Sequence, residues 1–114
     1  MTDAVVVLVN CANASEAARI ARALVTERLA ACVNVQQSAV RSIYRWQGKL
    51  ERTREVMLII KTTRRLFAPL ESRVRKLHGY AVPEIIALPV AAGSRRYLAW
   101  MERSVGGRRG RRRR

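Results

Sequence analysis

The sequence contains few of the residues that build disulfide frameworks and metal sites. Its 114 residues include two cysteines and one histidine. Cys11 and Cys32 belong to no CxxC or CxxH pair, and two cysteines do not make the dense framework of a small secreted protein. We therefore interpret both as free thiols, because an unpaired cysteine packs as a small hydrophobic side chain.

Long apolar runs and common catalytic motifs are also missing. No run reaches the roughly 18 to 20 apolar residues that cross a bilayer, and residues 1–3 lead into a strand without the basic segment of a signal peptide. We expect a cytoplasmic protein with no membrane partner. GxSxG, P-loop, HExxH and GxGxxG motifs are absent, and one histidine gives no confident Ser/His/Asp set. The sequence therefore predicts a protein that is not an enzyme.

Acidic residues are scarce, with 8 against 23 basic ones and a net charge of +15. Six of the arginines lie in residues 106–114, which have no apolar side chain, and this composition predicts a disordered tail behind one domain at residues 1–105. Such a tail would bind nucleic acid weakly and without sequence preference. Because it has no interleaved aromatic residues for base stacking, we do not interpret nucleic-acid binding as the main function.

The hydrophobic pattern predicts alternating strands and helices. An apolar run at residues 4–9 is typical of a buried strand. Asn13 followed by Glu16 resembles a capping box, and Ala17, Ile20, Ala21, Leu24 and Val25 recur at helical spacing, so we expect a helix over residues 14–30. Strands are predicted at residues 32–35, 40–46 and 56–62, with a turn at residues 47–49.

A second helix, a fourth strand and a short third helix complete the pattern. The second helix should begin near Arg65, because Pro69 is tolerated only within the first turn, and Gly79 should end it. A strand at residues 85–88 and a helix after Ser94 follow. The order βαββαβ with an extra C-terminal helix predicts an α+β, ferredoxin-like, two-layer sandwich. Both main helices would cover one face of the sheet, so we expect a homotrimer to bury the other.

Five collinear motifs follow one another along the chain, at residues 29–34 (LAACVN), 42–51 (SIYRWQGKLE), 61–63 (KTT), 80–85 (YAVPEI) and 97–100 (YLAW). Together they resemble the CutA family of divalent-cation tolerance proteins. The resemblance covers residues 5–104 and implies a ferredoxin-like protomer, a tight homotrimer and a cytosolic location. It also implies a role in the response to copper and other divalent ions.

The candidate metal ligands are His78, Glu84 and Cys11. His78 and Glu84 are six residues apart across a turn that can bring them to one cleft, although His78 can equally be a helix-end residue without a metal. In the family that the chain resembles, copper binding is associated with a cysteine at the end of the first strand and a histidine at the end of the second helix. Here Val9 occupies the aligned cysteine position, and Cys11 would face the same way if the strand reaches it.

A polar pocket is a second candidate site, with Trp46, Glu51, Glu55, Lys61 and Tyr80 as its expected lining. These residues lie at the ends of apolar strands, where core packing does not require them. A small anionic ligand is one occupant that this mixture of charges allows. The alternative function is therefore a trimeric small-ligand sensor or signalling protein of the nitrogen-regulatory type, which shares this architecture by fold analogy.

Overall fold

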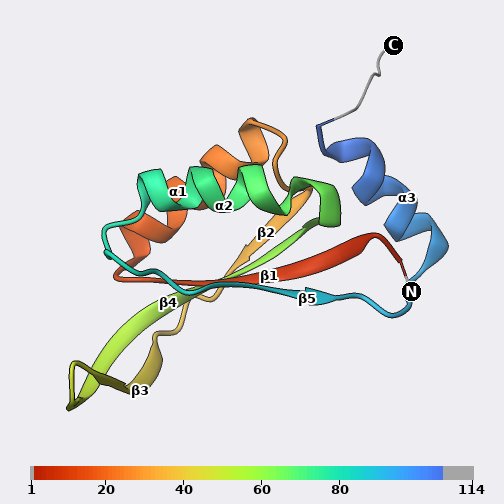
Figure 1. Cartoon of the computed structure of the whole chain (residues 1–114). Coiled ribbons are helices and arrows are strands. Elements are labelled where there is room, and N and C mark those ends of the chain that lie inside the picture. Colours follow the sequence, from red (N-terminus) through yellow and green to blue (C-terminus); the bar gives the residue numbers. More distant parts are fainter. Residues whose placement is uncertain (1, 107–114) are drawn as a thin grey trace.

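The structure is a computed structural model and describes residues 2–106. It is a mixed α+β fold, in which α1 and α2 lie side by side over one face of an antiparallel sheet (Figure 1). The elements in chain order are β1 (Ala4–Cys11), α1 (Ala14–Thr26), β2 (Cys32–Val35), β3 (Val40–Trp46), β4 (Lys49–Thr63), a 3-10 turn (Arg64–Leu66), α2 (Phe67–Leu77), β5 (Ile85–Pro89) and α3 (Arg95–Ser104). No helix in residues 2–106 is both long enough and apolar enough to span a membrane.

The sheet has the strand order β2-β4-β1-β5, and β3 pairs with β4 beyond the body of the sheet. Every pairing is antiparallel. The central strands β1 and β4 run in register from Ala4 opposite Thr63 to Cys11 opposite Val56. Figure 1 shows the β3–β4 hairpin projecting away from the helices. Within residues 2–106, a five-strand antiparallel sheet and three α-helices confirm the predicted α+β class.

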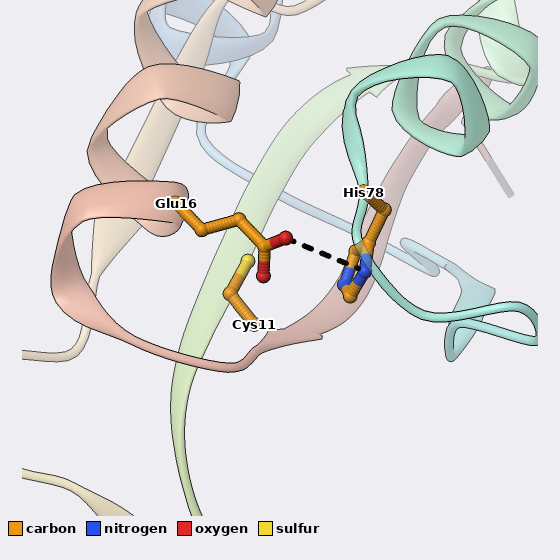
Figure 2. Close-up of side chains that lie close together, drawn as sticks. All are labelled: Cys11, Glu16 and His78. Carbon is orange, nitrogen blue, oxygen red and sulfur yellow. Dashed lines mark ion pairs between the residues drawn. The ribbon is translucent and has the colours of Figure 1, made fainter.

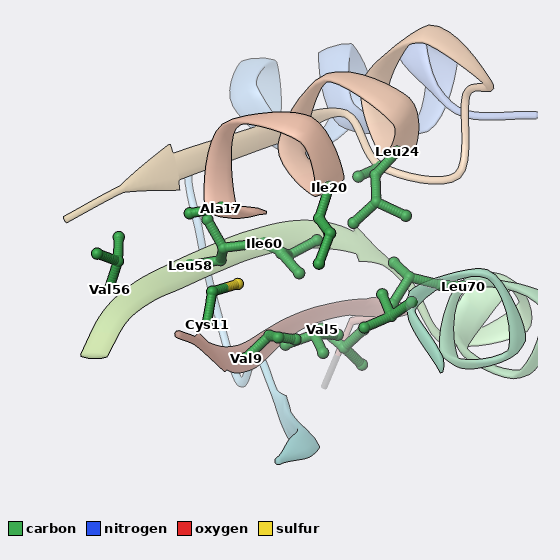
Figure 3. Packing of buried hydrophobic residues seen from close by; sticks show 13 residues of the cluster. Val5, Val9, Cys11, Ala17, Ile20, Leu24, Val56, Leu58, Ile60 and Leu70 are labelled. Carbon is green, nitrogen blue, oxygen red and sulfur yellow. The ribbon is translucent and has the colours of Figure 1, made fainter. Parts of the chain in front are cut away.

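The core lies between the sheet and the two main helices (Figure 3). Alternate residues of β1 and β4 point into it, because side chains along a strand alternate between its faces. Val7, Val9, Leu58 and Ile60 are fully buried there, against Ile20, Leu24, Leu70 and Val74 of the helices. A smaller cluster joins α3 to the sheet and consists of Ala4, Ala31, Met101 and Val105.

The opposite face of the sheet carries apolar side chains that neither α1 nor α2 covers. We call it the open sheet face, and it comprises Val6, Leu8, Met57, Ile59, Ile86 and Leu88. Ile86 and Leu88 are each about half exposed. The prediction of an apolar face without a helix layer is therefore matched by this arrangement.

Helix α1 ends earlier than predicted, at Thr26 rather than residue 30. Arg28 adopts the left-handed conformation with φ of 61°, which ends the helical path. Its guanidinium donates to the carbonyl oxygens of Arg103 and Val105, and its own carbonyl accepts from Gly106 N at 2.7 Å. The helix end is thus set by contacts with the C-terminal segment, which local periodicity does not reveal.

The C-terminal boundary also moves by one residue. The sequence predicts Gly106 to be part of the tail, yet its N–H donates to the Arg28 carbonyl oxygen and its own carbonyl accepts from Arg65 Nη2 at 2.9 Å. Gly106 therefore belongs to the folded body. The predicted disorder of the arginine-rich segment concerns residues 107–114, which lie outside the described residues.

Strand β4 starts at Lys49, not at residue 56, and so forms a long hairpin with β3. Residues 49–54 are largely polar and exposed, but they pair with β3 along its whole length, from Trp46 opposite Lys49 to Val40 opposite Glu55. Gln47 and Gly48 have φ values of 51° and 81°. Positive φ at both central residues is what a type I′ hairpin turn requires, so the turn needs only these two residues.

Candidate functional site

Cys11, Glu16 and His78 form a buried cluster at one end of the core (Figure 2). Cys11 is the last residue of β1, Glu16 lies in the first turn of α1, and His78 caps the C-terminus of α2. The thiol, carboxylate and imidazole donor atoms all lie within 4.8 Å of one another. Because β1 extends to Cys11, this residue faces the same core as Val9, and both are fully buried.

Glu16 is held by backbone N–H groups from two distant segments. Its Oε1 accepts from Ala12 N at 2.9 Å and its Oε2 from Gly79 N at 2.7 Å. Burial raises the pKa of this carboxyl, but the hydrogen bonds from Ala12 and Gly79, together with the nearby His78 and Arg19, outweigh that effect and leave the pKa below its ordinary value. Asn13 Oδ1 accepts from Glu16 N at 2.8 Å, as the capping prediction required.

Gly79 follows α2 for a different reason than predicted. The helix does end at Leu77, but His78 leaves it in an extended conformation, and Gly79 is not among the residues with positive φ. A Cβ atom on Gly79 would lie 3.1 Å from Glu16 Oε2. A close approach to the Glu16 carboxylate, rather than a left-handed stop, therefore favours glycine here.

The hydrogen bonds of His78 define its neutral tautomer. Nε2 lies 2.7 Å from the carbonyl oxygen of Asn10, and a carbonyl can only accept, so Nε2 carries the proton. Nδ1 accepts from Tyr80 N at 3.1 Å. The 3.9 Å contact from Nδ1 to Glu16 Oε2, drawn in Figure 2, becomes an ion pair only if the ring takes a second proton.

Cys11 is held as a thiol. Burial raises its pKa to about 12, and the negative charges of Glu16 and Glu55 act in the same direction. A metal ion would have to displace this proton, because the thiolate is the coordinating form. It would also have to replace Tyr80 N at His78 Nδ1.

The donor set fits a borderline or soft divalent ion. Sulfur and imidazole donors suit copper and zinc, and a carboxylate can complete the set. Ligand bonds of about 2.0 to 2.3 Å place donors on one ion at most about 4.6 Å apart, slightly less than the 4.8 Å spread observed. A small inward movement of the three side chains would therefore let all three donors bind one ion.

Glu84 is not part of this cluster, contrary to the expected set of His78, Glu84 and Cys11. It lies on the far side of Asn10, whose Nδ2 donates to Glu84 Oε1 at 3.2 Å. Glu16 takes the position of the carboxylate instead. The sequence predicts only a capping role for Glu16. Its contact with Gly79 N joins residues 63 positions apart in the chain, and no local sequence pattern indicates it.

A pocket of about 720 Å³ lies beside the cluster, between the β3–β4 hairpin and the loop after α2. It includes three of the five predicted lining residues, Trp46, Glu55 and Tyr80. Glu51 and Lys61 do not line it. Glu51 lies opposite Tyr44 in the β3–β4 pairing, and Lys61 lies opposite Val6, with its Nζ bonded to Asn34 Oδ1. The remaining lining residues are Asn10, Ser42, Ile43, Tyr44, Gly79, Ala81, Val82 and Glu84.

Glu55 is the most buried charged group of the pocket, with 6% of its surface exposed. Its Oε1 accepts from Ser42 Oγ at 2.6 Å and its Oε2 from Tyr80 Oη at 2.9 Å. Burial raises the pKa of Tyr80 well above its ordinary range, and the bond to Glu55 adds to the effect. Tyr80 therefore stays protonated and donates to Glu55 at any physiological pH.

Sequence comparison identifies the family. The profile of the CutA1 divalent ion tolerance protein family matches residues 5–104. The chain belongs to this family. It is 50% identical over 101 residues to the divalent-cation tolerance protein CutA of Thermus thermophilus, a match that covers 89% of this chain and 97% of that protein. It is 43% identical over 101 residues to the chloroplastic CutA protein of Arabidopsis thaliana, of which it spans 55%.

Solved structures of the family share the fold. The Thermus thermophilus divalent cation tolerance protein superposes with a TM-score of 0.88 at 48% identity, and the match covers 90% of this chain and 99% of that one. CutA from Xylella fastidiosa gives the same TM-score at 39% identity, with 92% and 100% covered. The family assigned from the sequence motifs is thus confirmed.

Proposed function

We propose that the chain acts as a non-enzymatic, cytoplasmic homotrimer in divalent-cation tolerance and that each protomer binds Cu²⁺ or another divalent ion at Cys11, Glu16 and His78. The observation that carries this proposal is the close approach of three different donor types from three segments of the chain, all buried. Exposed acidic groups often lie together without an ion, whereas this cluster is buried and adds a thiol and an imidazole to the carboxylate. The names of the relatives, which describe divalent-cation tolerance, agree with this site.

Isothermal titration with Cu²⁺ tests the site. We expect His78→Ala and Cys11→Ser each to weaken binding at least tenfold, because each removes one donor. Cys32→Ser removes the other thiol and Glu84→Gln a carboxylate outside the cluster, so both should bind as the wild type does. Affinity should rise with pH, because the bound ion displaces the Cys11 proton and needs neutral imidazole. Equal Cu²⁺ affinity in the wild type and in His78→Ala would show that Cu²⁺ does not bind at this cluster.

The homotrimer proposal is supported by the open sheet face. The strand order β2-β4-β1-β5 with two helices on one face suits a ferredoxin-like protomer whose other face is covered by assembly. An apolar patch of this kind is unusual on a monomer. Burial of this face between protomers would stabilise the assembly by about 25 cal/mol for each Å² of apolar surface that is removed from water.

Light scattering of the full chain at micromolar concentration tests the assembly. Ile59→Asp places a charge at the centre of the open sheet face, between Leu8 and Asn34 in the sheet register, and should dissociate or precipitate the assembly. Val25→Asp, on the exposed side of α1, is the matched control and should leave the mass unchanged. A monomer mass for the wild type would contradict the proposal.

A further inference from the structure

The pocket beside the hairpin has a chemistry that the metal proposal does not use. Among residues 2–106 its lining includes two carboxylates, Glu55 and Glu84, and no lysine or arginine. This balance is unfavourable for the small anionic ligand that the sequence suggested. It occurs in a chain with a net charge of +15, so the pocket is an acidic exception in a basic protein.

Glu55 lacks a positive partner. Both of its hydrogen-bond donors, Ser42 and Tyr80, are neutral hydroxyls, and no ion pair involves Glu55 in the described part of the chain. A carboxylate that is 94% buried is costly unless a cation or several donors compensate it. The pocket opening next to Glu55 leaves room for a positive group to approach it.

Asn10 contributes a further acceptor to the pocket. Asn10 Oδ1 is buried and has no hydrogen-bond partner within residues 2–106, while Asn10 Nδ2 donates to Glu84 Oε1. The hydroxyl protons of Ser42 and Tyr80 are both committed to Glu55. An occupant that carries N–H donors would match these acceptors, whereas a second acceptor-rich group would not.

Aromatic rings complete the lining. Tyr44, Trp46 and Tyr80 each expose between a third and a half of their surface. The faces of such rings attract cations, with about 0.5 to 2 kcal/mol per contact, and planar guanidinium groups also stack on them. An apolar stem would pack against Ile43 and Val82, which line the same pocket.

We infer that this pocket binds a small organic cation with N–H donors and an apolar stem, such as an alkylguanidinium, between Glu55, Glu84 and the rings of Tyr44, Trp46 and Tyr80. The carboxylates supply the counter-charge, the acceptors bind the N–H groups, and the rings hold the stem and the flat cation. This site contains none of the three cluster residues, and its binding requires no bound ion. Its preference for a cation follows from the buried Glu55, which has no ion-pair partner among the described residues.

The test is isothermal titration of the full chain, in a chelator, with butylguanidinium and with butylurea. Butylurea has nearly the same shape but no charge, so we expect it to bind at least tenfold more weakly. Glu55→Gln and Glu84→Gln should each weaken butylguanidinium binding at least fivefold. Glu51→Gln is the matched control, because it removes one charge from the same strand outside the pocket. Trp46 fluorescence should change in the wild type, with Trp46→Phe as its reference.

Three results would overturn the inference. Equal binding of butylurea would show that charge plays no part, and tighter binding of glutarate would show an anion site. No binding of butylguanidinium to the wild type would show that the pocket does not take a cation of this kind. Because Glu84 is exposed, Glu84→Gln gives an interpretable result even if Glu55→Gln does not fold.

Discussion

The strongest single test of the structure is the removal of the Glu16 carboxylate. Glu16 connects the start of α1 to the loop after α2 by accepting from Ala12 N and Gly79 N. Hydrogen bonds to a charged group contribute about 1.5 to 3 kcal/mol each. Glu16→Ala removes both and leaves two N–H groups without a partner, so we expect a loss of about 3 to 6 kcal/mol in the free energy of unfolding.

Glu16→Gln separates charge from shape. The amide oxygen can still accept from one N–H group, but the amide NH₂ then faces the other donor. We expect a loss of about 1.5 to 3 kcal/mol, close to one charge-assisted hydrogen bond. Glu71→Gln, in α2, is the control, because the Glu71 side chain makes no hydrogen bond or ion pair within residues 2–106. It should change stability by less than about 0.5 kcal/mol.

The assay is urea unfolding at one fixed protein concentration and in a chelator, since assembly and bound metal both shift apparent stability. The pH dependence has a definite sign. The folded pKa of Glu16 is depressed, so its stabilising effect is complete above its ordinary pKa of 4.5 and is lost as pH falls through the lower folded pKa. The gap between wild type and Glu16→Gln should therefore narrow below about pH 4.5. A gap that is absent at pH 7, or that does not change with pH, would refute the assigned hydrogen bonds.

Three further outcomes follow from the same contacts. Gly79→Ala should lower stability by about 1 kcal/mol in urea unfolding, because its Cβ would crowd Glu16 Oε2 at 3.1 Å; a more stable variant would contradict this. Iodoacetamide at pH 8 should label Cys32 well before Cys11, whose burial raises its pKa to about 12, and equal rates in mass spectrometry would argue against a buried thiol. Deletion of residues 107–114 removes six arginines but keeps the Gly106 hydrogen bonds, so heparin affinity should fall while the melting temperature stays the same; a lower melting temperature would show that the deleted residues support the fold.

Local features of the sequence predicted much of the fold. The apolar run of β1, the Asn13 cap and the position of Pro69 in the first turn of α2 each depend on neighbours within a few residues, and the structure has all three. The end of α1 depends instead on Arg28 meeting the C-terminal segment. No local rule contains that contact, so the helix was predicted four residues too long.

The site was predicted less well, and the reasons are geometric. Lys61 and Glu55 share a face of β4 because they are six residues apart, but six residues of a strand span about 20 Å. They cannot line one small pocket, and the structure places Lys61 at the opposite end, beside Asn34. Glu84 was paired with His78 because both flank one turn. In the structure Asn10 lies between them. The Asn10 carbonyl oxygen accepts from His78 Nε2, and the Asn10 side-chain amide donates to Glu84 Oε1.

These contacts also connect the metal cluster with the pocket, if both proposals hold. Coordination through His78 Nδ1 would replace the bond from Tyr80 N, and Tyr80 Oη is one of the two donors to Glu55. An ion in the cluster would thus shift Tyr80, which faces the pocket. We expect Cu²⁺ to change the affinity for butylguanidinium, and thermodynamic linkage requires butylguanidinium to change the Cu²⁺ affinity by the same factor. Titration of each ligand with and without the other measures both factors. Tyr80→Phe keeps the backbone N–H but removes the hydroxyl, so it should abolish most of the coupling while leaving Cu²⁺ binding intact; coupling that persists in this variant would exclude Tyr80 as the connection.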